Sequence, residues 1–127
     1  MLEFLKNLFR SHPQVPYAKP SPESEHALLI HLPLSNDSFG TRRERSNLSR
    51  LEDRIRAAMK QLGIGELDGH EFGEGQCVIY VYGHDADKLW DAVNAAVGSW
   101  RWPRGTHAIK RYGPPSNNVR KVRVEAR

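Results

Sequence analysis

The chain has 127 residues and a mass of 14.5 kDa, enough for one domain with a short extra segment but not for two full domains. Its residues are 39% hydrophobic and 27% charged, and the mean hydropathy is -0.64, which excludes the collagen-like, wholly disordered and coiled-coil classes. No apolar run approaches the roughly 20 residues that span a bilayer. We therefore expect a single globular domain.

Charge is distributed unevenly along the chain, although 19 basic and 15 acidic residues leave a net charge of only +4. Residues 1–40, 41–60, 61–99 and 100–127 carry net charges of -1, +4, -6 and +7, respectively. Blocks of this kind steer charged partners toward one part of a protein surface. The alternative is that they neutralise each other within the fold, because opposite charges on adjacent strands stabilise a sheet.

The chain has a single cysteine, Cys77, so no internal disulfide is possible. It lies in an apolar run, residues 77–82, where a small buried thiol packs well. The first ten residues are too short and too charged for a secretory signal, and no small-residue cleavage site follows them. We therefore expect a cytoplasmic protein.

Residues 1–12 are predicted to be an amphipathic segment that starts as a short helix. Its apolar side chains recur at helical spacing: Leu2, Phe4, Leu5, Leu8 and Phe9. A helix this short is marginal in water and must dock, on its own domain or alternatively on a membrane or a partner.

Residues 13–25 hold four of the eight prolines and are predicted to be an extended linker. Residues 26–127 then form the domain.

The first part of the domain is predicted to be a strand followed by a helix. Residues 27–32 are a short apolar run that ends at a proline, which is typical of a central strand. Residues 35–45 are polar and are predicted to be a loop. An apolar stripe over residues 48–62 predicts a helix. The expected helix caps are Ser46 or Asn47 at the start and Gly63 at the end.

A hairpin and a second helix are predicted next. The hairpin arms cover residues 67–72 and 77–82, and the turn between them is Gly73-Glu74-Gly75. The helix starts after Asp85, which is a good N-cap, and ends at Gly98.

Two more strands are predicted at residues 106–112 and 119–126, joined by a turn-rich segment. In the last strand Val122 and Val124 alternate onto one face. The order is β-α-β-β-α-β with an added C-terminal strand, the split βαβ pattern called ferredoxin-like, which makes the fold class α+β. Two helices would cover one face of an antiparallel sheet and leave the other face open, unless residues 1–12 fold over it.

Residues 65–75 and 82–89 carry a recognisable pattern. They resemble small uncharacterised bacterial proteins that have a G-x-x-D-G-x-E-x-G hairpin followed by Y-G-x-D-A-D, and residues 111–113 resemble the closing strand of those proteins. The resemblance covers residues 65–113, implies the ferredoxin-like fold and implies no particular activity. The chain departs from the pattern at His70 and His84, where those proteins have Asn and Pro.

One cluster of side chains has the chemistry of metal ligands or acid-base catalysts: Asp68, His70 and Glu71, followed by His84, Asp85 and Asp87. A metal-binding or hydrolytic site at Asp68, His70 and Glu71 is therefore one hypothesis. Against it, strand alternation places Asp68, His70 and Phe72 on one face and Glu71 on the other. We assign no catalytic residue and expect no cofactor, so a non-enzymatic protein is favoured over an enzyme and metal binding stays open.

The favoured interpretation is a non-enzymatic, protein-binding module of bacterial type, either an immunity- or antitoxin-like protein or a regulatory accessory. It follows from the compact scaffold, the charged blocks of both signs and the lack of a legible active site. The residues expected to face a basic partner are Asp68, Glu71 and Glu74. Either a monomer or a homodimer is compatible with the sequence, because the last strand is an edge candidate but carries basic residues that discourage pairing.

The alternative interpretation is a nucleic-acid-binding domain that uses the basic C-terminal strands. Basic residues there interleave with Trp100, Trp102 and Tyr112, the mixture that neutralises phosphates and stacks on bases. The candidate residues are Arg101, Arg104, Lys110, Arg111, Arg120, Lys121 and Arg123. Against it, the two tryptophans can equally seal the edge of the core. The strand histidines His31 and His107 are expected to face neighbouring strands rather than to bind a ligand.

Overall fold

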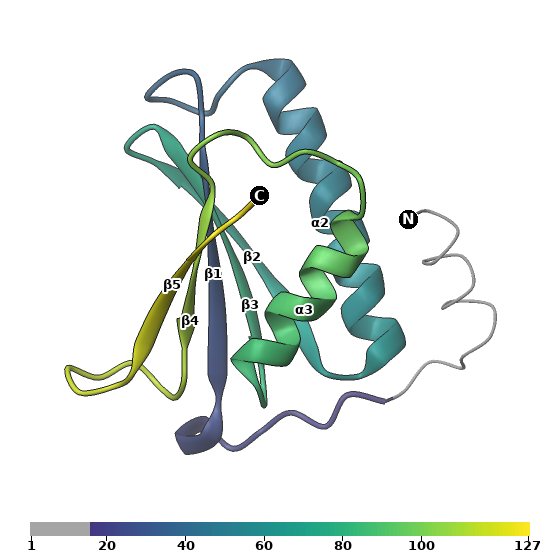
Figure 1. The fold of residues 1–127 in the computed structure, drawn as a ribbon, viewed down its shortest axis with the longest axis vertical. Helices are drawn as coiled ribbons and strands as arrows, with labels where there is room; N and C mark the ends of the chain where they lie inside the picture. The colour runs from purple at the N-terminus through teal and green to yellow at the C-terminus, as the bar shows by residue number, and fades with distance from the viewer. Residues whose placement is uncertain (1–15) are drawn as a thin grey trace.

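Two helices pack against one face of a five-stranded antiparallel sheet in the computed structural model of the protein (Figure 1). The structure describes residues 16–127, so the predicted segment 1–12 and the first part of the linker 13–25 lie outside the described residues. A short 3-10 turn, η1 (Pro22–Ser24), lies in the rest of the linker. The other elements are β1 (His26–Pro33), α2 (Arg42–Leu62), β2 (Gly65–Gly73), β3 (Gln76–Gly83), α3 (Ala86–Val97), β4 (His107–Arg111) and β5 (Lys121–Glu125).

The strand order in the sheet is β2-β3-β1-β4-β5. β1 is central and pairs with both β3 and β4, so that Leu29 lies between Tyr80 and Ile109. The predicted sequence of elements is confirmed, and the arrangement is compatible with the ferredoxin-like class, with β5 extending the sheet beyond β4. None of the helices in residues 16–127 has the length and apolar character needed to cross a membrane.

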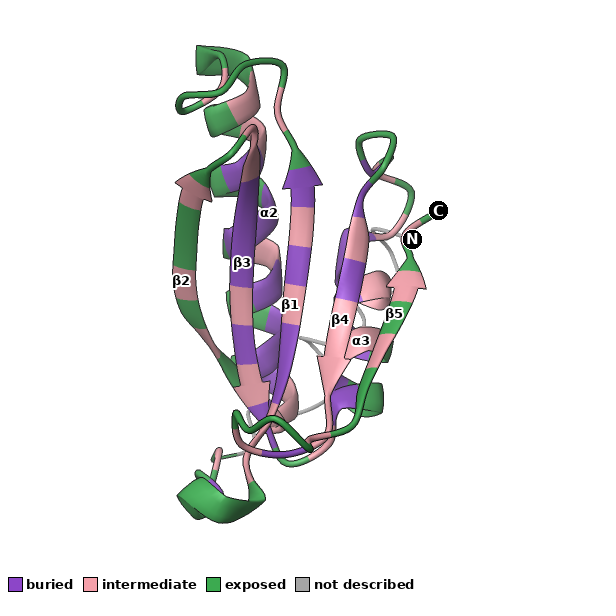
Figure 2. Cartoon of the chain, turned by 90° about the vertical axis from the view of Figure 1, so that its left-hand side faces the viewer, coloured by how far each residue is buried: buried purple, intermediate pink, exposed green. Residues whose placement is uncertain are grey.

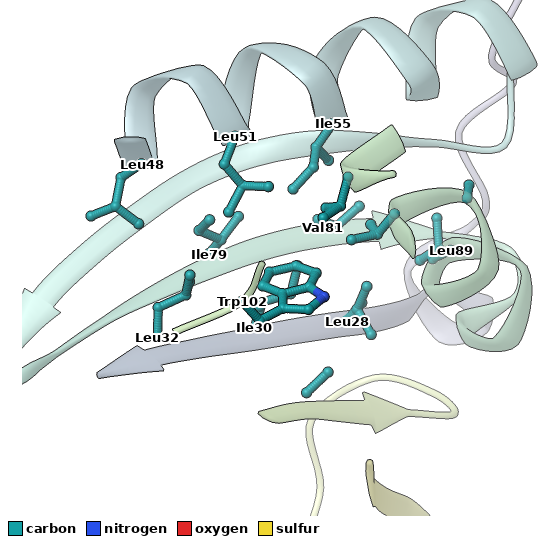
Figure 3. Packing of buried hydrophobic residues seen from close by; sticks show 14 of the residues in the cluster. Leu28, Ile30, Leu32, Leu48, Leu51, Ile55, Ile79, Val81, Leu89 and Trp102 are labelled. Atoms are coloured by element: carbon teal, nitrogen blue, oxygen red, sulfur yellow. The ribbon is translucent and has the colours of Figure 1, made fainter. Parts of the chain in front are cut away.

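The hydrophobic core lies between the sheet and the two helices (Figure 3). Alternate residues of β1 point into it, including Leu28 and Ile30, and they meet Leu51 and Ile55 of α2. Burial of each such side chain stabilises the fold by about 1.5–3 kcal/mol. Trp102, in the connection from α3 to β4, is buried in this core, and Trp100 packs against it, so both tryptophans contact the core as the alternative to base stacking predicted.

Helix α2 begins at Arg42, earlier than the sequence analysis predicted. Its N-cap is Thr41, whose hydroxyl accepts a hydrogen bond from the Glu44 amide at 3.1 Å, while the Glu44 carboxylate accepts one from the Thr41 amide at 2.8 Å. This reciprocal capping box outcompetes Ser46 and Asn47, so both predicted caps are wrong, and the predicted loop of residues 35–45 ends at Thr41 instead of Arg45. The other predicted ends are confirmed, with Gly63 at φ 64° after α2 and Asp85 before α3.

The hairpin of β2 and β3 contains an irregularity that the sequence analysis missed. Its turn places Glu74 and Gly75 at positive φ, 53° and 76°, as a tight two-residue hairpin requires. A bulge lies between Leu67 and Gly69, so Asp68 is an extra residue in β2. The predicted alternation is therefore wrong for Asp68.

Beyond the bulge, the alternation of β2 is regular. His70 and Phe72 pair with Ile79 and Cys77 and face the helices, whereas Glu71 pairs with Val78 on the other face. His70 and Phe72 thus share a face that Asp68 does not join.

Candidate binding face of the sheet

The face of the sheet opposite the helices is formed by side chains from all five strands, and we call it the open face (Figure 2). Alternate strand residues point to opposite faces, so each neighbour of a core residue in β1, β3 and β4 contributes to it. Both α2 and α3 lie on the other side of the sheet. Its side chains include Glu66 and Glu71 of β2, Tyr80 and Tyr82 of β3, Leu29 and His31 of β1, His107, Ile109 and Arg111 of β4, and Lys121, Arg123 and Glu125 of β5.

Acidic residues gather at the β2 edge of the open face. Asp68, Glu71 and Glu74, the set predicted to face a basic partner, are all exposed on β2 and its turn. Burial, followed by a hydrogen bond and the charge of Glu71, raises the pKa of Tyr80. Burial and then the charge of Asp68 raise the pKa of Tyr82. The two tyrosines therefore stand beside carboxylates and form the aromatic border of this acidic edge.

Two histidines stack on each other at the centre of the open face. The rings of His31 and His107 lie 4.6 Å apart at an interplanar angle of 6°, and His31 Nδ1 lies 3.3 Å from Oε1 of Gln76. The prediction that both histidines face neighbouring strands is confirmed. Burial lowers the pKa of His31, and the nearby charges of His107 and Arg123 lower it further, against the hydrogen bond with Gln76. The His31 ring is therefore neutral at neutral pH.

A groove of about 810 Å³ runs beside the histidines, over β1, β4, β5 and the loop that joins the last two strands. Leu29 and Ile109 give it an apolar floor, and its cationic side chains are Arg111, Lys121 and Arg123. Arg111 Nε donates to the carbonyl of Gly113 at 2.7 Å. Arg123 pairs with Glu125 at 2.7 Å, whereas Lys121 contacts no acidic side chain within residues 16–127.

The other residues of the predicted nucleic-acid-binding set lie elsewhere. Lys110 points to the helix side and pairs with Asp87 of α3 at 2.9 Å. Arg120 lies over the ring of Tyr112, at 4.7 Å from its centroid. Arg101 and Arg104 are exposed in the connection between α3 and β4. The basic C-terminal block is thus divided among several surfaces, and only the three residues of the groove share the open face.

The residues of the metal hypothesis are held apart by separate contacts. His70 faces α2, with Nδ1 2.9 Å from Oε2 of Glu52, whereas Glu71 lies on the open face and Asp68 occupies the bulge. Within residues 16–127 no group of three or more His, Cys, Asp or Glu side chains is placed to hold a metal ion.

The remaining members of that cluster are also engaged. The His84 ring bonds the Ala18 carbonyl and contacts the edge of Tyr17, which ties the end of the linker to the domain. The Asp85 carboxylate caps α3, and the Asp87 carboxylate accepts a hydrogen bond from the Tyr112 hydroxyl at 2.7 Å.

Cys77 is buried in the core, as predicted. Burial raises its pKa to about 12, with a smaller contribution from the charge of Glu52. The thiol therefore stays protonated at neutral pH, and a thiolate is the reactive form of cysteine.

Local sequence patterns do not reveal the groove or the histidine stack. His31 and His107 lie in strands that are distant in the chain and adjacent in the sheet, and only the strand order brings them together. The alternation of basic side chains in β5 was the one local signal of a cationic face. No family model matches the chain, and no curated protein or solved structure is significantly similar to it.

Proposed function

We propose that the chain is a non-enzymatic protein-binding module with a ferredoxin-like fold, and that its partner docks on the open face. The observation that carries the proposal is the polarity of that face. Carboxylates line its β2 edge, tyrosines and stacked histidines occupy its centre, and a cationic groove lies over β4 and β5.

This polarity favours a protein over a nucleic acid. A polynucleotide presents phosphates along its whole length, and the acidic edge formed by Asp68, Glu71 and Glu74 repels them. A folded partner presents both charge signs, so that a basic part meets β2 and an acidic part meets Lys121 and Arg123. Tyrosine and arginine are also the residue types that carry much of the binding free energy in protein interfaces.

The acidic edge sets the expected chemistry of the partner. A basic surface fits Asp68, Glu71 and Glu74, as expected of a basic toxin neutralised by an immunity- or antitoxin-like protein or of an enzyme controlled by an accessory protein. The separate engagement of His70, His84 and Asp87, together with the protonated Cys77, supports a binding role over catalysis.

Affinity capture with matched charge reversals tests the proposal. The tagged wild-type chain is used to capture partners from its native cells, with and without nuclease. The same is done with Asp68→Lys/Glu71→Lys and with Lys121→Glu/Arg123→Glu. The controls are Asp53→Lys/Asp91→Lys and Arg56→Glu/Lys60→Glu, which make the same charge changes on the helix layer.

A protein that survives nuclease, is retained by both controls and is lost from both open-face variants supports the proposal. Loss of all retained material after nuclease overturns it in favour of nucleic acid. A partner that both open-face variants retain also overturns it, because the docking surface is then elsewhere.

A further inference from the structure

Helix α2 carries a row of arginines that is not part of the open face. Arg43, Asn47, Arg50 and Arg54 follow one another at spacings of four, three and four residues, which places them on one face of the helix. Arg42 stands beside them in the first turn. The three arginines of the row span about 16 Å along the helix axis.

This row lines two adjoining grooves. A groove of about 580 Å³ is lined by Arg42, Arg43, Ser46, Asn47 and Arg50. A smaller one of about 190 Å³ is lined by Asn47, Arg50, Leu51, Arg54, Val97 and Trp100. They share Asn47 and Arg50, so together they form one channel along α2, which we call the arginine groove.

Within residues 16–127, no acidic side chain neutralises the positive charge of the arginine groove. The acidic residues of α2 are engaged elsewhere: Glu44 in the capping box, Glu52 with His70, and Asp53 with Arg56 at 3.4 Å. No acidic side chain from residues 16–127 lines either part of the groove. Arg54 donates to the Val97 carbonyl at 3.3 Å, which satisfies one donor and leaves its charge uncompensated.

Trp100 adds an aromatic surface to the smaller part of the arginine groove. Its ring contacts Trp102 edge to face, with centroids 5.6 Å apart, which holds the indole in place. Trp100 is only partly buried, and it lines the smaller part of the groove. An anchored indole beside several guanidinium groups combines a stacking surface with phosphate-binding donors.

We propose that the arginine groove binds a single-stranded nucleic acid, with phosphates on Arg43, Arg50 and Arg54 and a base against Trp100. The charge and the shape of the groove together favour this occupant. A lipid bilayer takes up apolar side chains, and the part of the groove lined by Arg42, Arg43, Ser46, Asn47 and Arg50 offers none. An acidic peptide supplies carboxylates that pair with the arginines. It lacks the regular alternation of phosphates and aromatic bases that a nucleic acid strand has.

This inference goes beyond the proposed function and does not depend on it, because the surface is on the helix layer. A short uridine oligonucleotide labelled with fluorescein is the probe, and its anisotropy is measured at several salt concentrations. The test variant is Arg43→Glu/Arg50→Glu. The matched control is Arg56→Glu/Lys60→Glu, with the same charge change on the same helix outside the groove. Unfolding curves establish that each variant is folded.

We expect the wild-type chain and the control to bind with a strong salt dependence. The test variant should bind about tenfold more weakly or worse, and the slope of log affinity against log salt should fall by about 1–2. Oligonucleotide binding should also quench tryptophan fluorescence, and Trp100→Phe should reduce that quenching.

Equal losses in the test variant and the control overturn the inference, because the effect is then one of net charge. Binding to vesicles of anionic phospholipid or to polyglutamate, with none to the oligonucleotide, overturns it as well. The two proposals can fail independently. Lys121→Glu/Arg123→Glu should leave oligonucleotide binding unchanged, and Arg43→Glu/Arg50→Glu should leave protein capture unchanged.

Discussion

The imidazole of His70, on the edge strand β2, lies against the carboxylate of Glu52 on α2, with Nδ1 2.9 Å from Oε2. Glu52 is only 8% exposed, so little water reaches its carboxylate to take over the hydrogen bond with the histidine. Phe72 packs its ring edge to face with His70 at 5.1 Å and holds the imidazole in position. The contact therefore fixes the outermost strand on the helix layer.

Replacing His70 should destabilise the fold. In His70→Ala the buried Glu52 carboxylate loses its partner, and an unsatisfied buried acceptor costs about 1–3 kcal/mol. Asp53→Ala is the control, because it removes the neighbouring exposed pair with Arg56, worth less than about 1 kcal/mol. Urea unfolding measures both. Equal losses in the two variants would show that the His70 contact contributes no more than a surface pair.

The capping box of α2 gives a second prediction. Thr41→Ala should lower the free energy of unfolding by about 1 kcal/mol, whereas Ser46→Ala should have almost no effect, because Ser46 is an exposed residue inside the helix. A larger loss of stability for Ser46→Ala than for Thr41→Ala would contradict the capping box and favour Ser46 as the cap, as the sequence predicted.

The capping contribution should also depend on pH. Hydrogen bonds from Thr41 and Ser35 hold the pKa of Glu44 below its ordinary value of 4.5. The stability that they supply is present above that value and is lost as the pH falls through the lower pKa of the folded state. The stabilities of the wild type and Glu44→Gln, measured by thermal unfolding, should therefore converge as the pH falls below 4.5.

The sequence predicted the order of elements because each carries a local signal. The apolar run of β1, the Gly63 cap and the Asp85 cap are local, and all three appear in the structure. The start of α2 was missed because the Thr41 capping box competes with two equally acceptable caps, and local sequence does not rank them.

The candidate site was less predictable because it depends on pairing between distant segments. The acidic set and the basic set were predicted from charge alone. Their division between faces follows from the bulge at Asp68 and from the alternation of β4 and β5. The stack of His31 and His107 requires the strand order, which local patterns do not encode.

Two glycines of β2, Gly65 and Gly69, provide a fourth prediction. A Cβ on Gly65 would lie 2.5 Å from the Tyr82 carbonyl and 2.6 Å from a Leu89 methyl, whereas one on Gly69 would meet nothing within 4 Å. Gly65→Ala should therefore lower the free energy of unfolding by about 1–3 kcal/mol or more, the usual cost of overpacking. Gly69→Ala should change it by less than about 0.5 kcal/mol. A tolerated alanine at position 65 would mean that β2 and α3 are packed less closely than the structure shows.

The histidine stack gives the last prediction, on pH. Because the pKa of His31 is lowered from 6.5 in the folded state, the unfolded chain binds a proton more readily at this site. The stability from a neutral His31 is thus fully present above pH 6.5 and is lost as the pH falls through the folded-state pKa. Side chains from three strands surround the ring: Gln76, His107 and Arg123.

Gln76 and His107 shift the pKa of His31 in opposite directions, so substitutions of these two residues should have opposite effects. His107→Gln removes a charge that disfavours protonation and should raise the pKa of His31, whereas Gln76→Ala removes a hydrogen bond that favours protonation and should lower it. The measurement is an NMR titration of the imidazole protons in the wild type and both variants. A wild-type pKa at or above 6.5, or shifts of the same sign in both variants, would contradict the arrangement of the ring that the structure shows.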